Sequence, residues 1–341
     1  MSVGNETVCI CCGSDQRELL GEYYSKAYRC FKEPYRLNRC RTCDFIYINP
    51  RPSPEVLSAF YSSEVAELGQ RLALKYTSPK PSVFNGTYTA AVRLLDHIHS
   101  IHPIQDDTKL LDVGCGVGFF LFFAQQKRKF IALGNDLGAH AVAYARERYQ
   151  LDVRHGELKD CLLASESLDV VRMSQVLEHL LDPIGTLAEV RRLLKPGGLL
   201  VIEIPCYDTF FSGLFKGNWA PLFHPVHLYQ FTPKTITAFL RRAGFEMADK
   251  IKVSACPMEV TGSLLNIMDF DYNRVLQDVA SASRWKKVKW ASVVTLLMPV
   301  FILEFLMLQA LSRAFDKGAV MTVFVRKPVP AIGSSSPLQR G

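Results

Sequence analysis

Three glycines at alternate positions follow an aspartate in an apolar run, and this stretch is the part of the chain best suited to holding a ligand. The run begins at Leu110, and Asp112 is followed by Gly114, Gly116 and Gly118. The pattern predicts a buried parallel strand that breaks into a loop and opens a helix. Glycine lets the backbone approach a ligand where any Cβ would collide. A dinucleotide loop has the spacing G-x-G-x-x-G, but its third glycine slot holds a phenylalanine here, which favours a different adenosine-bearing ligand.

Two cysteine pairs near the start of the chain predict a metal site. Cys9 and Cys12 form one C-x-x-C, and Cys40 and Cys43 form another. Each pair can place two thiolates on a tight turn, and two turns can close a tetrahedral four-sulfur site in which a zinc ion is structural. The stretch between the pairs is longer than in a usual zinc ribbon, so we expect additional strands there. Four buried free thiols are the alternative, and Cys11 is a spare thiol beside the first pair.

Four ordered segments together resemble the class I S-adenosylmethionine (SAM) methyltransferases, over about residues 88–327. The resemblance implies an α/β fold with a Rossmann-like, seven-stranded, mostly parallel sheet, helices on both faces, and an antiparallel last strand. Phe245–Ala255 is expected to be the sixth strand and Ala319–Arg326 the seventh. The segments that carry the resemblance are Leu110–Phe119, Phe130–Asp136, Leu168–His179 and Glu189–Glu203.

The resemblance also implies where SAM would bind. Asp112 is placed to attract the ammonium group of the ligand, directly or through water. Asp136 ends the second strand and is placed to accept both ribose hydroxyls, with a helix cap as its alternative role. Carboxyl ends of parallel strands line one crevice, so both acids belong there. Glu157 is the candidate acceptor for the adenine amine, and Asp160 is the second candidate. The predicted cofactor contacts are Asp112, Gly114, Gly116, Gly118, Asp136, Glu157, Ser174 and Gln175.

The loop after the fourth strand is one candidate for the acceptor side. Gln175–His179 resembles the E-x-x-E-H segment of metal-dependent O-methyltransferases such as the ubiquinone-pathway type. Gln175 replaces the first glutamate and cannot supply an anionic oxygen, so no divalent metal is expected at this site. Glu178 and His179 are expected instead to orient the loop by hydrogen bonds or to lie near the acceptor.

A histidine after the fifth strand is the other candidate. The run from His227 to Phe231 resembles the His-Leu-x-x-Phe segment of sugar C-methyltransferases, in which the histidine acts as a base. The match begins at His227, because the tyrosine and glutamate that precede it in that family are His224 and Val226 here. Histidine titrates near neutrality, which suits a proton acceptor, and a core or capping residue is the alternative. The predicted catalytic residues are therefore His227, Glu178 and His179.

The charge and cysteine content of the chain limit the kinds of binding partner and cellular location that we expect. The formal net charge is +7 and the basic residues are scattered, so we expect no nucleic-acid partner. A mild positive charge fits an anionic substrate or an acidic membrane surface better. The first 15 residues hold no apolar segment typical of a secretory signal. Ten cysteines in such a chain favour thiols or metal ligands over disulfides, and a cytoplasmic location is expected.

The sequence divides into three parts. Residues 1–60 are interpreted as the zinc-binding module with its linker, residues 61–330 as the methyltransferase domain, and residues 331–341 as a flexible tail. Ser53 is the expected cap of a helix that begins at Pro54.

An apolar insert, residues 257–318, separates the last two strands. Its run Trp290–Leu311 is long and apolar enough to cross a membrane. A single crossing would put the flanking strands on opposite sides, and Pro299 and Glu304 disfavour a lipid-facing helix. We therefore expect residues 285–315 to lie on or dip into a bilayer, which would place the protein peripherally on the membrane surface. A homodimer interface and a lid over an apolar acceptor are the alternatives.

Together these features predict a SAM-dependent methyltransferase that uses SAM and a structural Zn²⁺. The four-cysteine front module resembles that of sugar and cell-surface polysaccharide methyltransferases, so the expected acceptor is a small molecule, a sugar or a lipid-linked glycan. Two alternatives stay open. One is an O-methyltransferase of a prenylated quinone or lipid, and the other is a non-catalytic SAM-binding scaffold.

Overall fold

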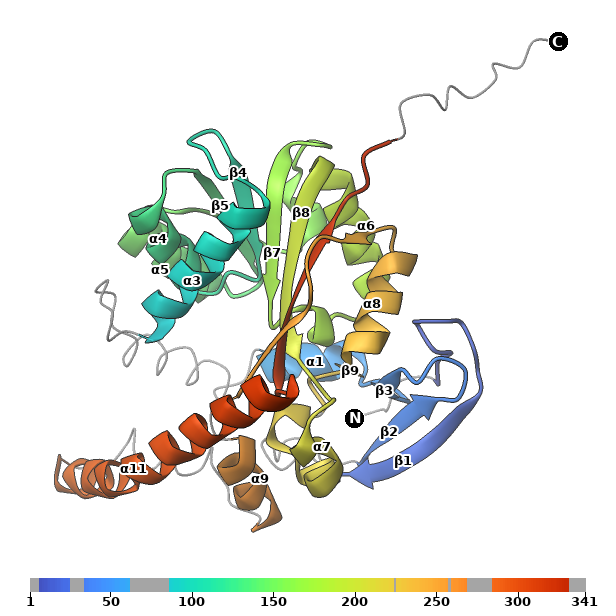
Figure 1. Cartoon of the computed structure of the whole chain (residues 1–341), viewed down its shortest axis with the longest axis vertical. Helices are drawn as coiled ribbons and strands as arrows, with labels where there is room; N and C mark the ends of the chain where they lie inside the picture. Colours follow the sequence, from blue (N-terminus) through green and yellow to red (C-terminus); the bar gives the residue numbers. More distant parts are fainter. Residues whose placement is uncertain are drawn as a thin grey trace.

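A central, mostly parallel sheet forms the body of the protein in the computed structural model (Figure 1). The structure describes residues 6–24, 34–61, 86–223, 225–256, 259–268 and 284–330. The strands lie in the order β6-β5-β4-β7-β8-β12-β10, and β11 also pairs with β12. Neighbouring strands are parallel throughout the run β6-β5-β4-β7-β8. Strand β12 runs antiparallel to β8, β10 and β11. The predicted fold class and its antiparallel last strand are confirmed.

The sixth strand is divided in two. Between its pieces, Asp249 contacts α3 (Gly86–Ile101), where its carboxylate lies 2.8 Å from Nε2 of His97. The bounds of the sheet strands are β4 (Lys109–Val113), β5 (Ile131–Asp136), β6 (Asp152–His155), β7 (Leu168–Ser174), β8 (Leu194–Pro205), β10 (Glu246–Met247), β11 (Lys252–Ser254) and β12 (Val320–Arg326).

Helices cover both faces of the sheet, which explains why the central strands are almost continuously apolar. Alternate residues of β8 serve the two layers: Leu199 and Val201 pack towards α3, α4 and α5, while Leu200 and Ile202 pack towards α6 and α8. Figure 1 shows these helix groups on opposite sides of the sheet. The helices are α3 (Gly86–Ile101), α4 (Phe119–Lys127), α5 (Ala139–Tyr149), α6 (Pro183–Leu193) and α8 (Pro233–Arg242).

The front of the chain forms a second, antiparallel sheet. The predicted strands between the cysteine pairs are β1 (Arg17–Tyr23) and β2 (Tyr35–Cys40), followed by β3 (Ile46–Ile48). A fourth strand, β9 (Tyr229–Gln230), comes from the middle of the chain and pairs with β3. The helix expected after Ser53 is α1 (Pro54–Tyr61). Because β9 belongs to residues 61–330, the front module completes its sheet with a strand from outside it.

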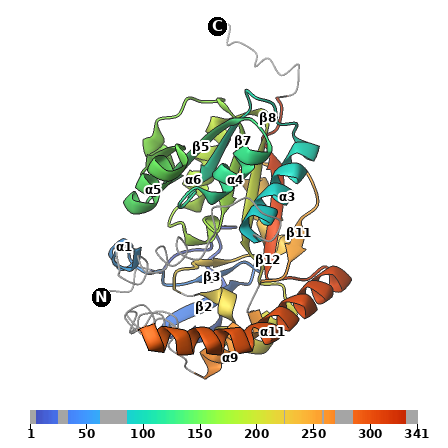
Figure 2. The ribbon, with the colours of Figure 1, turned by 90° about the vertical axis from the view of Figure 1, so that its left-hand side faces the viewer.

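The described part of the insert is two helices that project from the end of the molecule where the front sheet also lies (Figures 1 and 2). They are α9 (Glu259–Ile267) and α11 (Arg284–Phe315). Glu304 of α11 accepts hydrogen bonds from the backbone N–H groups of Val260 (2.9 Å) and Thr261 (3.1 Å) at the start of α9. Within the described residues, one stretch, Met298–Phe315, is long and apolar enough to cross a membrane. Both flanking strands, β11 and β12, lie in one sheet, as the topology argument expected.

The remaining helices are short. They are α7 (Phe210–Phe215) and the 3-10 helices η1 (Leu158–Cys161), η2 (Leu177–His179), η3 (Lys216–Asn218) and η4 (Ala220–Leu222). The predicted tail, residues 331–341, lies outside the described residues.

Candidate active site

The three glycines of the β4–α4 loop have different surroundings. All have positive φ, which favours glycine. A Cβ on Gly114 would lie 2.5 Å from Val176, and one on Gly118 would lie 2.5 Å from Leu151, so these two glycines permit tight packing of the protein on itself. A Cβ on Gly116 would meet no atom within 4 Å. Gly116 is therefore the position where a ligand could lie against the backbone.

Asp136 is held firmly at the end of β5. Its Oδ2 accepts a hydrogen bond from the N–H of Gly116 (2.8 Å), and its Oδ1 accepts one from the N–H of Gly138 (2.7 Å). The carboxylate is only half-buried. Each carboxylate oxygen has a second lone pair, so both can still accept ribose hydroxyls. The two roles considered for Asp136, turn stabilisation and ribose binding, are thus compatible, and the cradle of Gly116 and Asp136 fits the nucleoside part of SAM.

Asp112 lies deeper than a direct ligand contact requires. It is 1% exposed, and its Oδ1 accepts a hydrogen bond from Nη1 of Arg172 at 2.7 Å. Burial raises the pKa of the Asp112 carboxyl, and Arg172 offsets part of that rise. The guanidinium of Arg172 also stacks 4.2 Å from the ring centre of Phe120. The predicted contact between Asp112 and the ligand ammonium stays a prediction.

Two of the predicted residues lie at the end of β7, beside an acid that sequence reasoning missed. Ser174 donates a hydrogen bond from Oγ to Oε1 of Glu203 (3.0 Å), and the N–H of Gln175 donates to the backbone oxygen of Glu203 (2.8 Å). Gln175 is exposed and has a positive φ of 54°. Glu203 interrupts the apolar run of the fifth strand, and this was the signal available in the sequence. Together with Asp112 and Asp136, Glu203 makes this edge of the sheet acidic, which suits a ligand with a sulfonium and an ammonium group.

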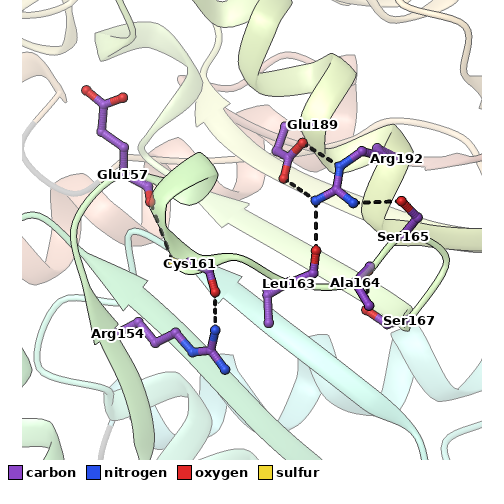
Figure 3. A network of polar contacts seen from close by, with 9 residues as sticks. All are labelled: Arg154, Glu157, Cys161, Leu163, Ala164, Ser165, Ser167, Glu189 and Arg192. Carbon is purple, nitrogen blue, oxygen red and sulfur yellow. Dashed lines mark hydrogen bonds and ion pairs between the residues drawn. The ribbon is translucent and has the colours of Figure 1, made fainter.

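Glu157 is the N-cap residue of η1 (Leu158–Cys161) and lies at the surface. Figure 3 shows its carboxylate pointing away from Arg154 and Arg192, while its backbone oxygen accepts a contact from the Cys161 thiol at 3.5 Å. Its carboxylate pairs with Lys159 at 2.8 Å. Asp160, the second candidate, accepts from the N–H of Glu157 (3.3 Å) and completes a capping box. The adenine role therefore stays a prediction for either residue.

The three predicted catalytic residues meet in one group, in which Glu178 and His227 are buried and His179 is half-buried. Glu178, His179 and His227 offer one ligand atom each within 4.8 Å of one another, although about 50 residues of chain separate the first two from the third. The two imidazole rings cross at 75° with their centres 4.6 Å apart. Nδ1 of His179 lies 3.0 Å from the carbonyl oxygen of Val226, and Nδ1 of His227 lies 3.0 Å from that of Pro221.

Burial shifts the pKa of two members of this group, Glu178 and His179. Glu178 is completely buried, and neither of its carboxylate oxygens has a hydrogen-bond partner among the described residues. Burial, reinforced by the charge of Glu203, raises the pKa of Glu178 to about 8. Burial lowers the pKa of His179 to about 4, so this imidazole is neutral at physiological pH. The expectation that Glu178 orients the loop by hydrogen bonds therefore fails for its side chain within the described chain; its backbone oxygen accepts from the N–H of Leu228 (2.8 Å).

Helix α9 of the insert is hydrogen-bonded to residues close to the Glu178–His179–His227 group. Glu259 of α9 is 2% exposed, and its Oε1 accepts hydrogen bonds from Nε1 of the buried Trp219 (2.8 Å) and from the Thr209 hydroxyl (2.9 Å). Ser263 of α9 accepts from the N–H of Ala220 in η4 (2.9 Å). The next residue in η4, Pro221, is the one whose carbonyl holds His227. The insert is therefore connected to His227 through η4, by one hydrogen bond from Ala220 to Ser263 and one between Pro221 and His227.

The four predicted cysteine ligands converge. Sγ of Cys9 lies 3.7 Å from that of Cys43, and Sγ of Cys12 lies 3.5 Å from that of Cys40. A tetrahedral ion with metal–sulfur distances of about 2.3 Å would hold its sulfurs about 3.8 Å apart. These separations match that geometry and exceed any S–S bond, for which about 2.05 Å is normal.

Matching turns position the two cysteine pairs. The N–H of Gly13 donates to the carbonyl of Cys9 (2.7 Å), and the N–H of Asp44 donates to that of Cys40 (3.0 Å). Gly13 and Asp44 have similar left-handed φ values of 79° and 63°. Burial raises the pKa of the Cys40 thiol, but hydrogen bonds from the backbone of Cys43 and Thr42 and from the Cys12 and Cys43 side chains together outweigh it and lower that pKa to about 7. Burial raises the pKa of Cys9 to about 12 and also raises that of Cys43. Four cysteine sulfurs at these separations are the donor set that a structural zinc ion takes, as thiolates.

Comparisons with known proteins agree with this architecture. A family model described as a methyltransferase domain matches residues 60–250. The chain is 36% identical over 146 residues to a "probable S-adenosylmethionine-dependent methyltransferase" of Mycolicibacterium smegmatis, over 42% of this chain and 54% of the relative. It is 28% identical over 182 residues to the ubiquinone biosynthesis O-methyltransferase of Cereibacter sphaeroides, over 50% of this chain and 73% of that enzyme.

Solved structures bear on the fold alone. The crystal structure of the [4+2]-cyclase SpnF superposes with a TM-score of 0.52 at 19% identity, covering 82% of this chain and 97% of that one. The chain spans about half the length of the Mycolicibacterium relative. The family match covers more than half of the chain and includes both the glycine loop and the Glu178–His227 group. The protein therefore belongs to the methyltransferase-domain family, and its fold is that of the class I SAM-dependent methyltransferases.

Proposed function

We propose that the protein transfers a methyl group from SAM to a small acceptor carried on a lipid, such as a lipid-linked sugar. The observation that carries the SAM part is the cradle formed by Gly116 and Asp136. Gly116 leaves space beside the backbone, and its N–H fixes the carboxylate that would accept the ribose hydroxyls. SAM supplies an electrophilic methyl group when bound. The chain's own part is to align the acceptor and exclude water, which can account for several kcal/mol of the barrier.

The arrangement of the insert supports the lipid part of the proposal. On α11, the exposed apolar side chains include Val300, Leu303 and Leu306, which are 57%, 69% and 58% exposed. An exposed apolar patch of this kind is typical of a membrane or partner surface. Since α9 contacts both α11 and η4, a bilayer under α11 would lie on the side of the molecule that holds His227. We infer a peripheral, cytoplasmic enzyme whose acceptor enters from the membrane.

A prenylated quinone is the second candidate acceptor. The specific support is the similarity to the Cereibacter ubiquinone biosynthesis O-methyltransferase, at 28% identity over half of this chain. Such an acceptor is also delivered from a bilayer, and its phenolic oxygen would need a base or another means of losing a proton.

A structural zinc ion at the four cysteines completes the proposal. Cys9, Cys12, Cys40 and Cys43 would hold it, and four protein ligands leave no position for substrate. Its contribution would be to fix the β1–β3 sheet.

SAM binding is tested by calorimetry. We expect the wild-type protein to bind SAM and its demethylated product, and Asp136→Ala to lower SAM affinity by about 30-fold, because charge-assisted hydrogen bonds contribute about 1.5–3 kcal/mol. Asp107→Ala, at an exposed aspartate outside the site, is the matched control and should bind SAM normally. A folded wild-type protein that ignores both ligands would overturn the proposal.

The acceptor is tested with label-bearing SAM and a fractionated cell extract. We expect label in the lipid-extractable fraction. Label confined to the water-soluble fraction contradicts the lipid-linked acceptor, and SAM binding without label in any fraction favours the non-catalytic scaffold.

Membrane contact is tested with vesicles. Leu303→Glu combined with Leu306→Glu should lower sedimentation with anionic vesicles at least about tenfold, since each buried leucine contributes about 1.5–3 kcal/mol. Leu162→Glu, at a leucine that is 87% exposed elsewhere, is the control. Unchanged vesicle binding together with a lost dimer would assign α11 to a homodimer interface.

A further inference from the structure

A completely buried carboxylate faces two imidazoles, and neither of its oxygens has a hydrogen-bond partner among the described residues. This carboxylate is that of Glu178, whose side chain has no exposed surface. An uncompensated buried carboxylate is costly, so such a group either holds a proton or binds a cation. The described residues place no lysine or arginine in ion-pair contact with Glu178. The side chains that do converge on it are His179 and His227.

The two histidines are oriented as metal ligands usually are. A backbone carbonyl only accepts hydrogen bonds, so Nδ1 of His179 must donate to Val226 and Nδ1 of His227 must donate to Pro221. With Nδ1 used as the donor, Nε2 is the ring atom that each histidine offers as a metal ligand. Metal-binding histidines characteristically make such a second hydrogen bond, which orients the ring.

The third ligand is the one that sequence comparison could not supply. Gln175 stands where the E-x-x-E-H pattern has its first glutamate, and this argued against a metal. His227 enters the group from a distant segment and provides a nitrogen in place of that oxygen. We propose that Glu178, His179 and His227 form a second metal site, which binds a divalent transition ion of the zinc and cobalt type. Two imidazoles and one carboxylate favour such an ion over magnesium, which prefers oxygen ligands.

This site differs in kind from the four-cysteine site. Three protein ligands leave at least one coordination position for water or an acceptor oxygen, as in catalytic zinc sites. A metal on Nε2 of His227 and the use of the same nitrogen as a general base exclude one another, so the inference also changes the role expected of His227. It does not depend on SAM binding, which involves other residues.

Metal stoichiometry tests the inference. The full chain, stripped of metal and reconstituted with Zn²⁺, should retain two equivalents by elemental analysis, and Glu178→Gln and His227→Ala should each retain one. Reconstitution with Co²⁺ should show thiolate-to-cobalt charge transfer that both variants keep, because the cysteine site is intact. His97→Gln, which alters a histidine–carboxylate pair of 2.8 Å elsewhere, is the matched control and should retain two equivalents.

Foldedness is followed by SAM binding and circular dichroism, with His179→Gln as a second variant should Glu178→Gln unfold. One equivalent in the wild-type protein, or two equivalents in folded variants of all three ligands, would overturn the proposal. Because SAM affinity is read separately, a failure of the metal site is distinguishable from a failure of the methyltransferase proposal.

Discussion

The proposed SAM site around Gly116 and Asp136, called here the cofactor crevice, and the group of Glu178, His179 and His227, called here the acceptor group, are built in different ways. Both begin at the carboxyl ends of parallel strands, β5 for Asp136 and β7 for Glu178. The crevice comes from neighbouring stretches of chain, β4, its loop and β5, and the oxygens of its main acid are already bonded to backbone N–H groups. The acceptor group joins segments that are about 50 residues apart and contains a buried acid whose oxygens lack protein partners among the described residues. The carboxylate of the crevice is therefore held in place by local backbone groups, whereas the geometry of the acceptor group depends on packing between distant segments.

Two backbone hydrogen bonds connect the front sheet to the acceptor group. The N–H of Ile48 donates to the carbonyl of Leu228 (2.9 Å), and the N–H of Leu228 donates to the carbonyl of Glu178 (2.8 Å). No comparable link joins the described part of the front sheet to the glycine loop. The two regions should therefore respond differently when the cysteine site is damaged.

The largest expected effect comes from Cys40→Ser. We expect it to abolish metal binding at the cysteines and to lower turnover by at least about 100-fold, because a misplacement of about 1 Å at a catalytic group has an effect of that size. SAM affinity should stay within about threefold of wild type, since the crevice is made by other elements. Calorimetry and turnover measured on one preparation provide the check. A parallel loss of SAM affinity would show that the regions form one cooperative unit.

The next largest effect is expected for His227→Ala. Turnover should fall about 100-fold, whether the imidazole serves as a base or as a ligand, because either function is typically worth that much. SAM affinity should not change. Steady-state kinetics at saturating SAM are the measurement, with His97→Ala as control. An unchanged rate would remove His227 from catalysis.

A smaller and opposite pattern is expected for Asp136→Asn. The amide keeps one acceptor oxygen but loses the charge, so SAM affinity should fall about tenfold, or about 1.4 kcal/mol. Turnover at saturating SAM should remain near wild type, and metal content should be unchanged. If turnover fell while affinity held, Asp136 would belong to the chemistry and the contrast between the regions would be lost.

The smallest effects separate two glycines of one loop. Gly116→Ala should weaken SAM binding about fivefold with a modest loss of stability, because its Cβ would enter the open ligand space and a left-handed alanine costs about 1 kcal/mol. Gly118→Ala should lower stability more, by about 2 kcal/mol, since its Cβ would collide with Leu151. Thermal unfolding with and without SAM measures both. Equal losses of affinity would place both glycines against the ligand.

The same contrast explains how much the sequence predicted. The strand and glycine loop followed from a local pattern, since an apolar strand and its loop are read within about ten residues. The whole sheet and the expected role of Asp136 followed from the family resemblance that four such local segments carry together. Glu178 and His227 were predicted as catalytic residues from two separate motifs, but their direct convergence was not predicted, because it depends on packing between distant segments. The pairing of Tyr229 with Tyr47 was equally hidden, since a two-residue strand carries no periodicity. Glu203 was overlooked because it lies within an otherwise apolar strand.

The strand β9 has a consequence for how the chain is made. The edge of β3 can be covered only after Tyr229 and Gln230 have left the ribosome, about 180 residues after β3 itself. Until then, the nascent protein carries an open strand edge, and such edges pair with other chains. A messenger cut short before residue 229 would therefore yield an aggregation-prone fragment even if its cysteines had already captured zinc, and the amino-terminal module cannot be transplanted to another protein without taking this short strand with it.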